Sequence, residues 1–193
     1  MDRAVDNPSP GDGFEGNGPR PPLIPPFPPR HDFDRAYQAW LDAHVAYWGS
    51  EECVVLPKVA TNAMRTVANW RRGENAVEAL PPRGTPVATF LGRKGQPSRY
   101  WDGREGLGIT GNNTTHAGVL AGYQRTAGGA VTGLKLWELY PGCGGVRRKI
   151  YPIDDTLFGT ANARSYFVIH DRDGRPLGGV DNPFFRIWQA RRK

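Results

Sequence analysis

The chain has 193 residues and a mass of 21.3 kDa, which fits one domain and excludes two large ones. Hydrophobic residues make up 38% of it, and six Trp, seven Tyr and eight Phe are enough to fill one compact core. No run approaches the roughly 18 apolar residues that a membrane-spanning helix needs, so we expect a soluble protein without a membrane span. The net charge of +6 favours an anionic polymer as partner, whether nucleic acid, an acidic membrane face or the bacterial cell wall.

The first 31 residues are expected to form an arm outside the fold. Nine of the 18 prolines lie within residues 1–30, and proline fixes φ and lacks an amide hydrogen, which favours extended polyproline II structure. The arm is either a spacer or a docking peptide for a delivery apparatus or an aromatic-lined groove. It has no uninterrupted apolar stretch behind a basic start, so a Sec signal peptide is not expected.

Two helices are expected next. Apolar and aromatic residues recur at three- and four-residue steps over 32–48, which predicts a helix there. A second helical stretch is predicted from Ser50, a plausible N-cap, to about Trp70. Pro57 lies inside this stretch and is expected to kink or delay it.

After residue 84 the hydrophobic period falls to two, which indicates strands. Helices followed by mostly antiparallel strands predict an α+β fold, with the N-terminal helices packed on a sheet of about five to six strands. The candidate strands are Thr85–Leu91, His116–Tyr123, Leu134–Tyr140, Val146–Ile153 and Ser165–Asp171. The domain is expected to span 32–171, followed by a basic tail over 172–193.

The interval from residue 92 to 115 is too long for a plain connection, so we expect a binding loop there. It contains Tyr100, Trp101 and Asn113, which are candidate substrate-binding residues together with Trp137 from the following strands. These aromatic side chains are equally consistent with a place in the core.

Cys53 is the candidate nucleophile. It is expected at a helix N-terminus, where unpaired amide donors favour thiolate over thiol. This requires that the carboxylates of Glu51 and Glu52 point outward. The alternative is an inert core cysteine. Cys143, the second cysteine, lies between glycines and is expected in an exposed turn.

A nucleophilic thiol needs a base, and four histidines are available. His31 lies in the arm, His44 on the apolar face of the first helix and His170 at a charged strand end, where a solvated role is expected. His116 instead opens an apolar strand directly after a polar loop. This position at the edge of a loop-built cleft suits a catalytic imidazole.

Glu138 is the candidate acid that orients His116. The two-residue period places it on the same face as Leu134 and Leu136. A carboxylate on an inward face is costly unless it is paired, and pairing with His116 would meet this cost. The alternative is a structural salt bridge to one of Arg147, Arg148 or Lys149.

In this order the motifs resemble a small family, the BPSL-type members of the NlpC-like, papain-fold cell-wall cysteine peptidases, which are related to the CHAP amidohydrolases. The resemblance covers roughly residues 49–171. The strings that carry it are Glu52-Cys53-Val54, Trp70 to Glu74, Gly84 to Phe90, Gly111-Asn112 leading to His116-Ala117, Gly133 to Tyr140, and Tyr166 to Ile169.

The resemblance implies a papain-like fold and a thiol hydrolase that cleaves an amide bond in peptidoglycan stem peptides. Cys53 then matches the family nucleophile, His116 its base and Glu138 its acid. Some members of the family resemble amidase toxins delivered by type VI secretion, so the resemblance also implies an export apparatus, an immunity protein and action in the periplasm of a target cell. No metal or other cofactor is expected, because no Cys/His spacing approaches a zinc site.

Two other functions stay open at this point. A non-catalytic binder of cell-wall polymer or nucleic acid would use the basic tail and the aromatics, although no recognisable nucleic-acid-binding pattern is present, so nucleic acid is not expected. An acyltransferase or transglutaminase-like enzyme would use the same three residues.

Overall fold

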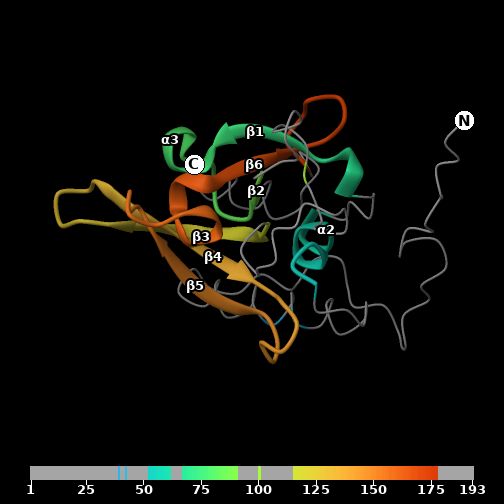
Figure 1. Ribbon diagram of the computed structural model, residues 1–193, viewed down its shortest axis with the longest axis horizontal. Coiled ribbons are helices and arrows are strands. Elements are labelled where there is room, and N and C mark those ends of the chain that lie inside the picture. Colours follow the sequence, from blue (N-terminus) through green and yellow to red (C-terminus); the bar gives the residue numbers. More distant parts are fainter. Residues whose placement is uncertain are drawn as a thin grey trace, which may run out of the picture.

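The computed structural model describes residues 39, 42, 52–61, 67–90, 100 and 115–177. Within these ranges the fold is α+β, with six strands in one antiparallel sheet and short helices around it (Figure 1). This confirms the predicted fold class. The arm and most of the helix predicted over 32–48 lie outside the described residues, although Ala39 and Asp42 are helical.

The sheet has the strand order β1-β6-β2-β3-β4-β5, and every neighbouring pair is antiparallel. The strands are β1 (Arg71–Asn75), β2 (Pro86–Thr89), β3 (Ala117–Arg125), β4 (Val131–Glu138), β5 (Arg147–Pro152) and β6 (Tyr166–His170). The short helical elements are α2 (Val55–Thr61), α3 (Ala76–Ala79), and the 3₁₀ turns η2 (Val67–Asn69), η3 (Gly159–Ala161) and η4 (Ala163–Ser165). The last strand, β6, therefore inserts between β1 and β2.

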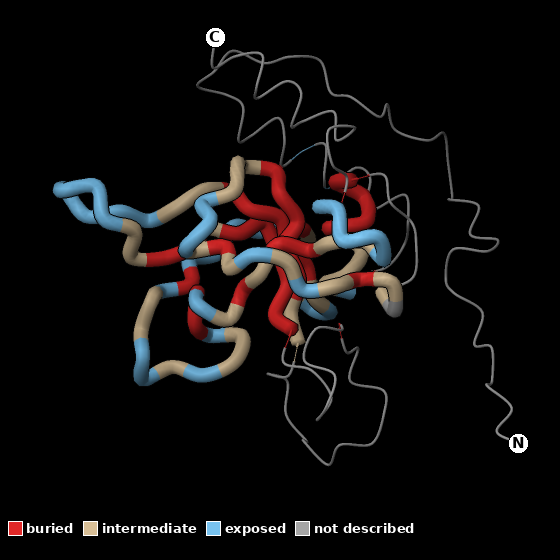
Figure 2. Tube along the Cα trace, turned by 90° about the horizontal axis from the view of Figure 1, so that it is seen from above, coloured by how far each residue is buried: buried red, intermediate tan, exposed pale blue. Residues whose placement is uncertain are grey.

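Successive side chains along β3 and β4 point to opposite faces of the sheet, and both faces are buried. Val119 and Trp137 pack against Leu56 of α2 on one face. On the other face, Leu120 and Leu136 pack together in a second cluster. Because protein covers both faces, these strands are buried at the centre of the sheet, whereas the hairpin tip between β3 and β4 is exposed (Figure 2).

The β3–β4 register sets the position of the site. It shifts between Leu120 and Gly122, where Gly122 adopts φ of +140°, a backbone conformation open to glycine. On the site side of this bulge, Gly118 lies opposite Glu138. His116 precedes Gly118 by two residues, so it shares the face of Glu138.

The second helical stretch is described in two parts, α2 over Val55–Thr61 and the 3₁₀ turn η2 over Val67–Asn69, and residues 62–66 between them lie outside the described residues. Residues 52–54 are not helical, so α2 begins later than the predicted start at Ser50. Pro57 is the third residue of α2. The amide groups of a first helical turn have no partner within the helix, so proline is tolerated there, and the start of α2 at Val55 agrees with the delay that Pro57 was expected to cause.

The domain continues past the predicted boundary at residue 171. The Leu177 N–H donates to the Ile169 carbonyl oxygen at 2.7 Å, and the Leu177 side chain is buried in the core. Residues 172–177 thus turn back onto β6 rather than starting a tail. Among the helices that the structure describes, none is long and apolar enough to cross a membrane.

Candidate active site

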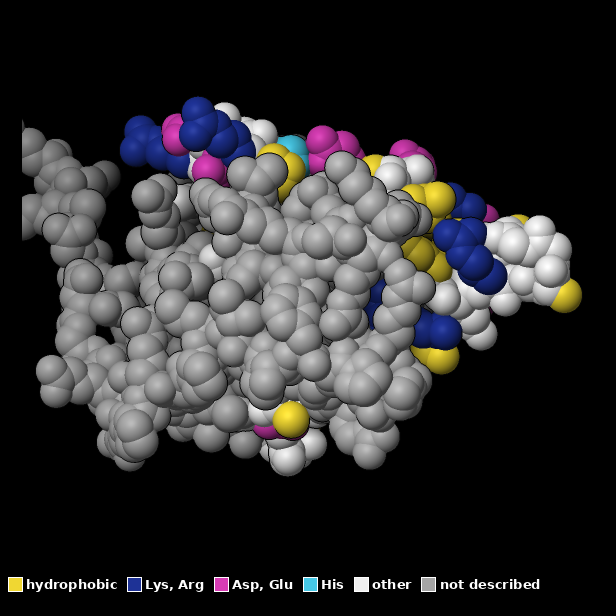
Figure 3. Space-filling view, turned by 180° about the vertical axis from the view of Figure 1, so that it is seen from behind, with side chains coloured by type: hydrophobic (Ala, Val, Ile, Leu, Met, Phe, Trp, Pro, Cys, Tyr) yellow, Lys and Arg dark blue, Asp and Glu magenta, His cyan; other side chains and the backbone are white. Residues whose placement is uncertain are grey.

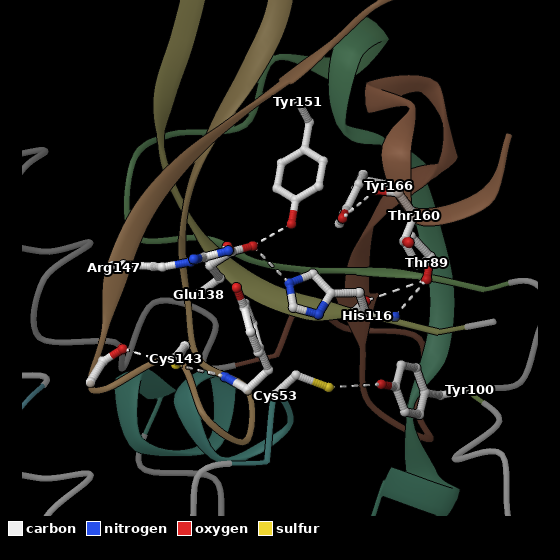
Figure 4. Close-up of polar contacts among 12 residues, drawn as sticks. Cys53, Thr89, Tyr100, His116, Glu138, Cys143, Arg147, Tyr151, Thr160 and Tyr166 are labelled. Carbon is white, nitrogen blue, oxygen red and sulfur yellow. Dashed lines mark hydrogen bonds and ion pairs between the residues drawn. The ribbon is translucent and has the colours of Figure 1, made fainter. Parts of the chain in front are cut away.

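A row of polar residues crosses one end of the sheet (Figure 4). Tyr166 begins β6 and pairs with Thr89 at the end of β2. His116 immediately precedes β3, and Glu138 ends β4 directly opposite Arg147, the first residue of β5. Antiparallel pairing of the strands therefore brings these five residues, which come from different parts of the chain, to the same end of the sheet.

The backbone of His116 is fixed by Thr89. The His116 N–H donates to Thr89 Oγ1 at 2.8 Å, and the Thr89 N–H donates to the His116 carbonyl oxygen at 2.9 Å. Thr89 itself is fully buried. The rings of Tyr140, Tyr151 and Tyr166 surround the imidazole, with centroid distances of 6.5, 6.1 and 6.5 Å. The imidazole therefore has little freedom to turn.

Glu138 is fully buried and accepts three hydrogen bonds. Its Oε2 lies 3.0 Å from His116 Nε2 and also accepts from the Tyr151 hydroxyl, while its Oε1 accepts from Arg147 Nε at 2.8 Å. Burial raises the pKa of the carboxyl, but the hydrogen bonds from His116, Tyr151 and Arg147 lower it by more, to about 2. The imidazole and the arginine, considered from the sequence as alternative partners, thus bind the same carboxylate.

Cys53 is half-buried and lies two residues before α2. Its Sγ is 3.7 Å from the Tyr100 hydroxyl. Because Nε2 of His116 binds Glu138, its other ring nitrogen, Nδ1, is left for the thiol. The close-up view shows the imidazole between Cys53 and the carboxylate (Figure 4).

The thiol and the imidazole shift each other's pKa in opposite directions. Burial raises the pKa of Cys53, but the hydrogen bond and charge of His116, with smaller contributions from Tyr100 and the Ala117 amide, bring the net pKa below its usual value. Burial lowers the pKa of His116, but hydrogen bonds to Cys53 and Glu138 raise it to about 9. Both shifts favour a thiolate–imidazolium pair near neutral pH.

Two of the expected substrate-binding residues can be placed. Trp137 is 1% exposed and fills the core between α2 and the sheet, so its position does not support a substrate contact. Tyr100 is also buried, with its ring packed edge-on against Trp70 and Phe90, and only its hydroxyl reaches the thiol. Trp101 and Asn113 lie outside the described residues, as does most of the predicted binding loop.

The two cysteines have different environments, and both are free thiols. Cys143 lies in the turn after β4, as expected, but is half-buried rather than exposed. Its Sγ accepts from the Tyr140 N–H at 3.2 Å and donates to the Gly145 carbonyl oxygen at 3.1 Å. Glu52 is exposed, as the activation of Cys53 requires, and Glu51 lies outside the described residues.

His170 was expected to be solvated, but its side chain is only 12% exposed. Its Nε2 lies 2.9 Å from Glu74 Oε2, so it forms a second histidine–carboxylate pair between β1 and β6. His31 and His44 lie outside the described residues. Within the described ranges, no group of three His, Cys, Asp or Glu side chains could hold a metal ion.

Sequence reasoning missed Thr89 and Tyr151. Tyr151 stands four residues after Arg147 on β5 and so shares its face, but only the register between β4 and β5 shows that this face carries Glu138. Thr89 lies in an apolar run and carries no local signal of a contact with His116.

Comparison with known proteins gives one weak structural likeness. No family model and no curated protein sequence matches the chain. A solved structure, the type 6 secretion amidase effector 2 (Tae2), is similar with 17% sequence identity and a TM-score of 0.44, over 62% of this chain and 81% of that chain. A TM-score below 0.5 is too low to support a functional inference, so the interpretation below rests on the site.

Proposed function

We propose that the chain is a papain-like cysteine amidase that hydrolyses an amide bond in peptidoglycan stem peptides. The observation that supports the proposal is the arrangement of Cys53, His116 and Glu138, in which a buried carboxylate binds Nε2 of an imidazole that lies between this carboxylate and the thiol (Figure 4). An inert core cysteine would have its pKa raised by burial alone. Here the pKa of Cys53 is lowered, which supports a nucleophile.

The first half-reaction forms a thioester. The Cys53 thiolate attacks the amide carbonyl carbon, and the oxyanion that forms accepts hydrogen bonds from backbone N–H groups near Cys53. The imidazolium of His116 then gives its proton to the leaving nitrogen, the C–N bond breaks and the amine departs. Glu138 keeps its negative charge throughout and stabilises the imidazolium.

The second half-reaction returns the enzyme to its starting state. His116, now neutral, removes a proton from a water molecule, which attacks the thioester carbonyl. The C–S bond breaks, the product leaves as a carboxylic acid that loses its proton to solvent, and the thiolate–imidazolium pair forms again. An amine that replaced the water would give acyl transfer by the same residues, so product analysis with an added amine distinguishes the two reactions.

The proposed substrate rests on the sequence resemblance and on charge. A net charge of +6 would hold the protein on an anionic wall. On the face shown in Figure 3, Lys and Arg side chains of the described residues lie at the upper left and at the right, with acidic side chains along the upper edge between them. As an extension of the proposal, the protein acts in the periplasm of a target cell after type VI delivery, and an immunity protein blocks the site in the producer.

The test is digestion of purified sacculi followed by mass spectrometry of the soluble products. The wild-type protein is expected to release shortened stem peptides, and the mass difference identifies the bond. Cys53→Ala should abolish release with an unchanged circular dichroism spectrum, while Cys143→Ser, the matched control, should retain it. Equal activity of Cys53→Ala would refute the proposal, and binding to sacculi without any product would favour a wall-polymer binder.

A further inference from the structure

Arg147 has a guanidinium group whose position is fixed at the edge of the candidate site. Its Nε donates to the buried Glu138 Oε1 at 2.8 Å, and its Cζ lies 4.4 Å from the centroid of the Tyr140 ring. The side chain is nevertheless 42% exposed. A cation stacked on an aromatic ring and tethered at one nitrogen is already ordered before any ligand binds.

Most of the hydrogen-bonding capacity of this guanidinium is not used by the part of the chain that the structure describes. A guanidinium carries five N–H donors. Among the residues that the structure describes, Arg147 makes one hydrogen bond, through Nε, and the two terminal nitrogens Nη1 and Nη2 make none. Glu138 does not require them, because Tyr151 and His116 already donate to its second oxygen.

The free edge of the guanidinium lies close to the reacting groups. Arg147 and His116 bind the two oxygens of one carboxylate, and both lie against the ring of Tyr140, so the guanidinium and the catalytic imidazole share two neighbours. The two terminal nitrogens form a planar fork that matches the two oxygens of a carboxylate. A substrate amide next to His116 can thus bring a neighbouring anionic group to Arg147.

We propose that Arg147 forms a subsite for a substrate carboxylate adjacent to the amide bond that is cleaved. The inference rests on the proposed function and narrows it to peptides that carry a free carboxylate beside the scissile bond, on an acidic side chain or at a chain end. Arg147 then has two roles. Its Nε positions Glu138, and its terminal nitrogens select the substrate.

The experiment compares two substrate preparations from the same sacculi. One contains native stem peptides, and in the other the carboxylates have been converted to carboxamides. The wild-type protein should cleave the native peptides with a kcat/KM about 10- to 100-fold higher, as expected for a charged hydrogen-bonded pair, with the difference mainly in KM. In Arg147→Gln the ratio of kcat/KM for native peptides to kcat/KM for amidated peptides should fall to about one.

The ratio between the two substrates isolates the binding role. Arg147→Gln also weakens the support of Glu138, but that loss lowers kcat for both substrates and cancels in the ratio. Arg147→Lys keeps a charge next to Glu138 without the fork, so it should fold and lose most of the preference. Arg148→Gln, which removes the same charge from the neighbouring position on β5, should keep the wild-type ratio.

The outcomes separate this inference from the proposed function. If the wild-type protein cleaves neither preparation, the proposed function is wrong. If it cleaves both equally well, the amidase proposal stands and the carboxylate subsite is refuted. A wild-type preference that persists in both Arg147→Gln and Arg147→Lys would assign the recognition to another residue and would also refute it.

Discussion

Nε2 of His116 lies 3.0 Å from Glu138 Oε2, which fixes the orientation of the imidazole and the nitrogen that carries its proton. The carboxylate accepts a hydrogen bond from Nε2, so the neutral ring has its lone pair on Nδ1, the nitrogen available to Cys53. The buried negative charge also stabilises the imidazolium, consistent with a His116 pKa of about 9.

Glu138→Gln tests this pairing. The amide NH₂ of glutamine can donate to Nε2 and would stabilise the opposite tautomer, which has its proton on the nitrogen facing the thiol. We expect kcat to fall about 10²- to 10⁴-fold. The pKa of His116 should also fall, so the alkaline limb of the pH–rate profile should move to lower pH.

Glu74→Gln provides the control for this substitution. It removes the carboxylate from the other histidine–glutamate pair, which joins β1 to β6 through His170 and Glu74. The side chain of Glu74 is exposed. Sacculus digestion by this variant should be close to that of the wild-type protein. Similar losses in both variants would indicate a general structural effect and would count against a special role of Glu138.

The stability of the fold should depend on pH through the same pair. The pKa of His116 is raised from 6.5 to about 9, so its contribution is fully present below pH 6.5 and is lost as the pH rises to about 9. The pKa of Glu138 is lowered from 4.5 to about 2, so its contribution is present above pH 4.5 and is lost as the pH falls toward 2. Urea denaturation at a series of pH values from about 2 to 9 measures the loss of the free energy of unfolding at both the acidic and the alkaline end.

His116→Gln separates these contributions from those of other groups. Cys53, whose pKa is lowered, contributes a slope of opposite sign in the same interval, so the comparison is made in a Cys53→Ala background. There His116→Gln should remove the decline in the free energy of unfolding above pH 6.5, and an unchanged slope would show that His116 has the same pKa in the folded and unfolded chains.

Gly73 is expected to be intolerant of a side chain. A Cβ at this position would lie 2.3 Å from His170 Nε2, so Gly73→Ala must displace the ring and break its bond to Glu74. We expect a loss of about 1–3 kcal/mol in the free energy of unfolding. Gly128→Ala is the matched control, because the nearest atom to its Cβ is 3.8 Å away, and chemical denaturation of the two variants should differ clearly.

The sequence predicts correctly those strands in which apolar and polar residues alternate clearly. The sequence placed Glu138 on the face of Leu134 and Leu136, and all three side chains are fully buried. Strand β1 was missed because its residues, from Arg71 to Asn75, are charged or polar apart from Gly73 and alternate only between partly buried and exposed. Its strand structure comes from pairing with β6, a contact about 100 residues away in the chain that no local pattern reveals.

The same limit applies to the candidate site. His116 and Glu138 could be selected because each is a chemically costly residue in an apolar strand context. The role of Tyr151 depends on the pairing of β5 with β4, which the sequence does not encode locally. From the sequence, Trp137 was equally consistent with a substrate contact and with the core, and its packing against α2 makes it a core residue.

The pH dependence of Cys53 alkylation, followed by mass spectrometry of the intact protein and its peptides, tests the central claim most directly. The account predicts that Cys53 reacts rapidly with iodoacetamide at neutral pH, that its apparent pKa lies below the usual thiol value of 9.0, and that His116→Ala raises it. Cys143 in the same sample serves as the internal reference. A Cys53 rate that follows an ordinary thiol pKa and does not change in His116→Ala would contradict the thiolate–imidazolium pair and the enzyme built on it.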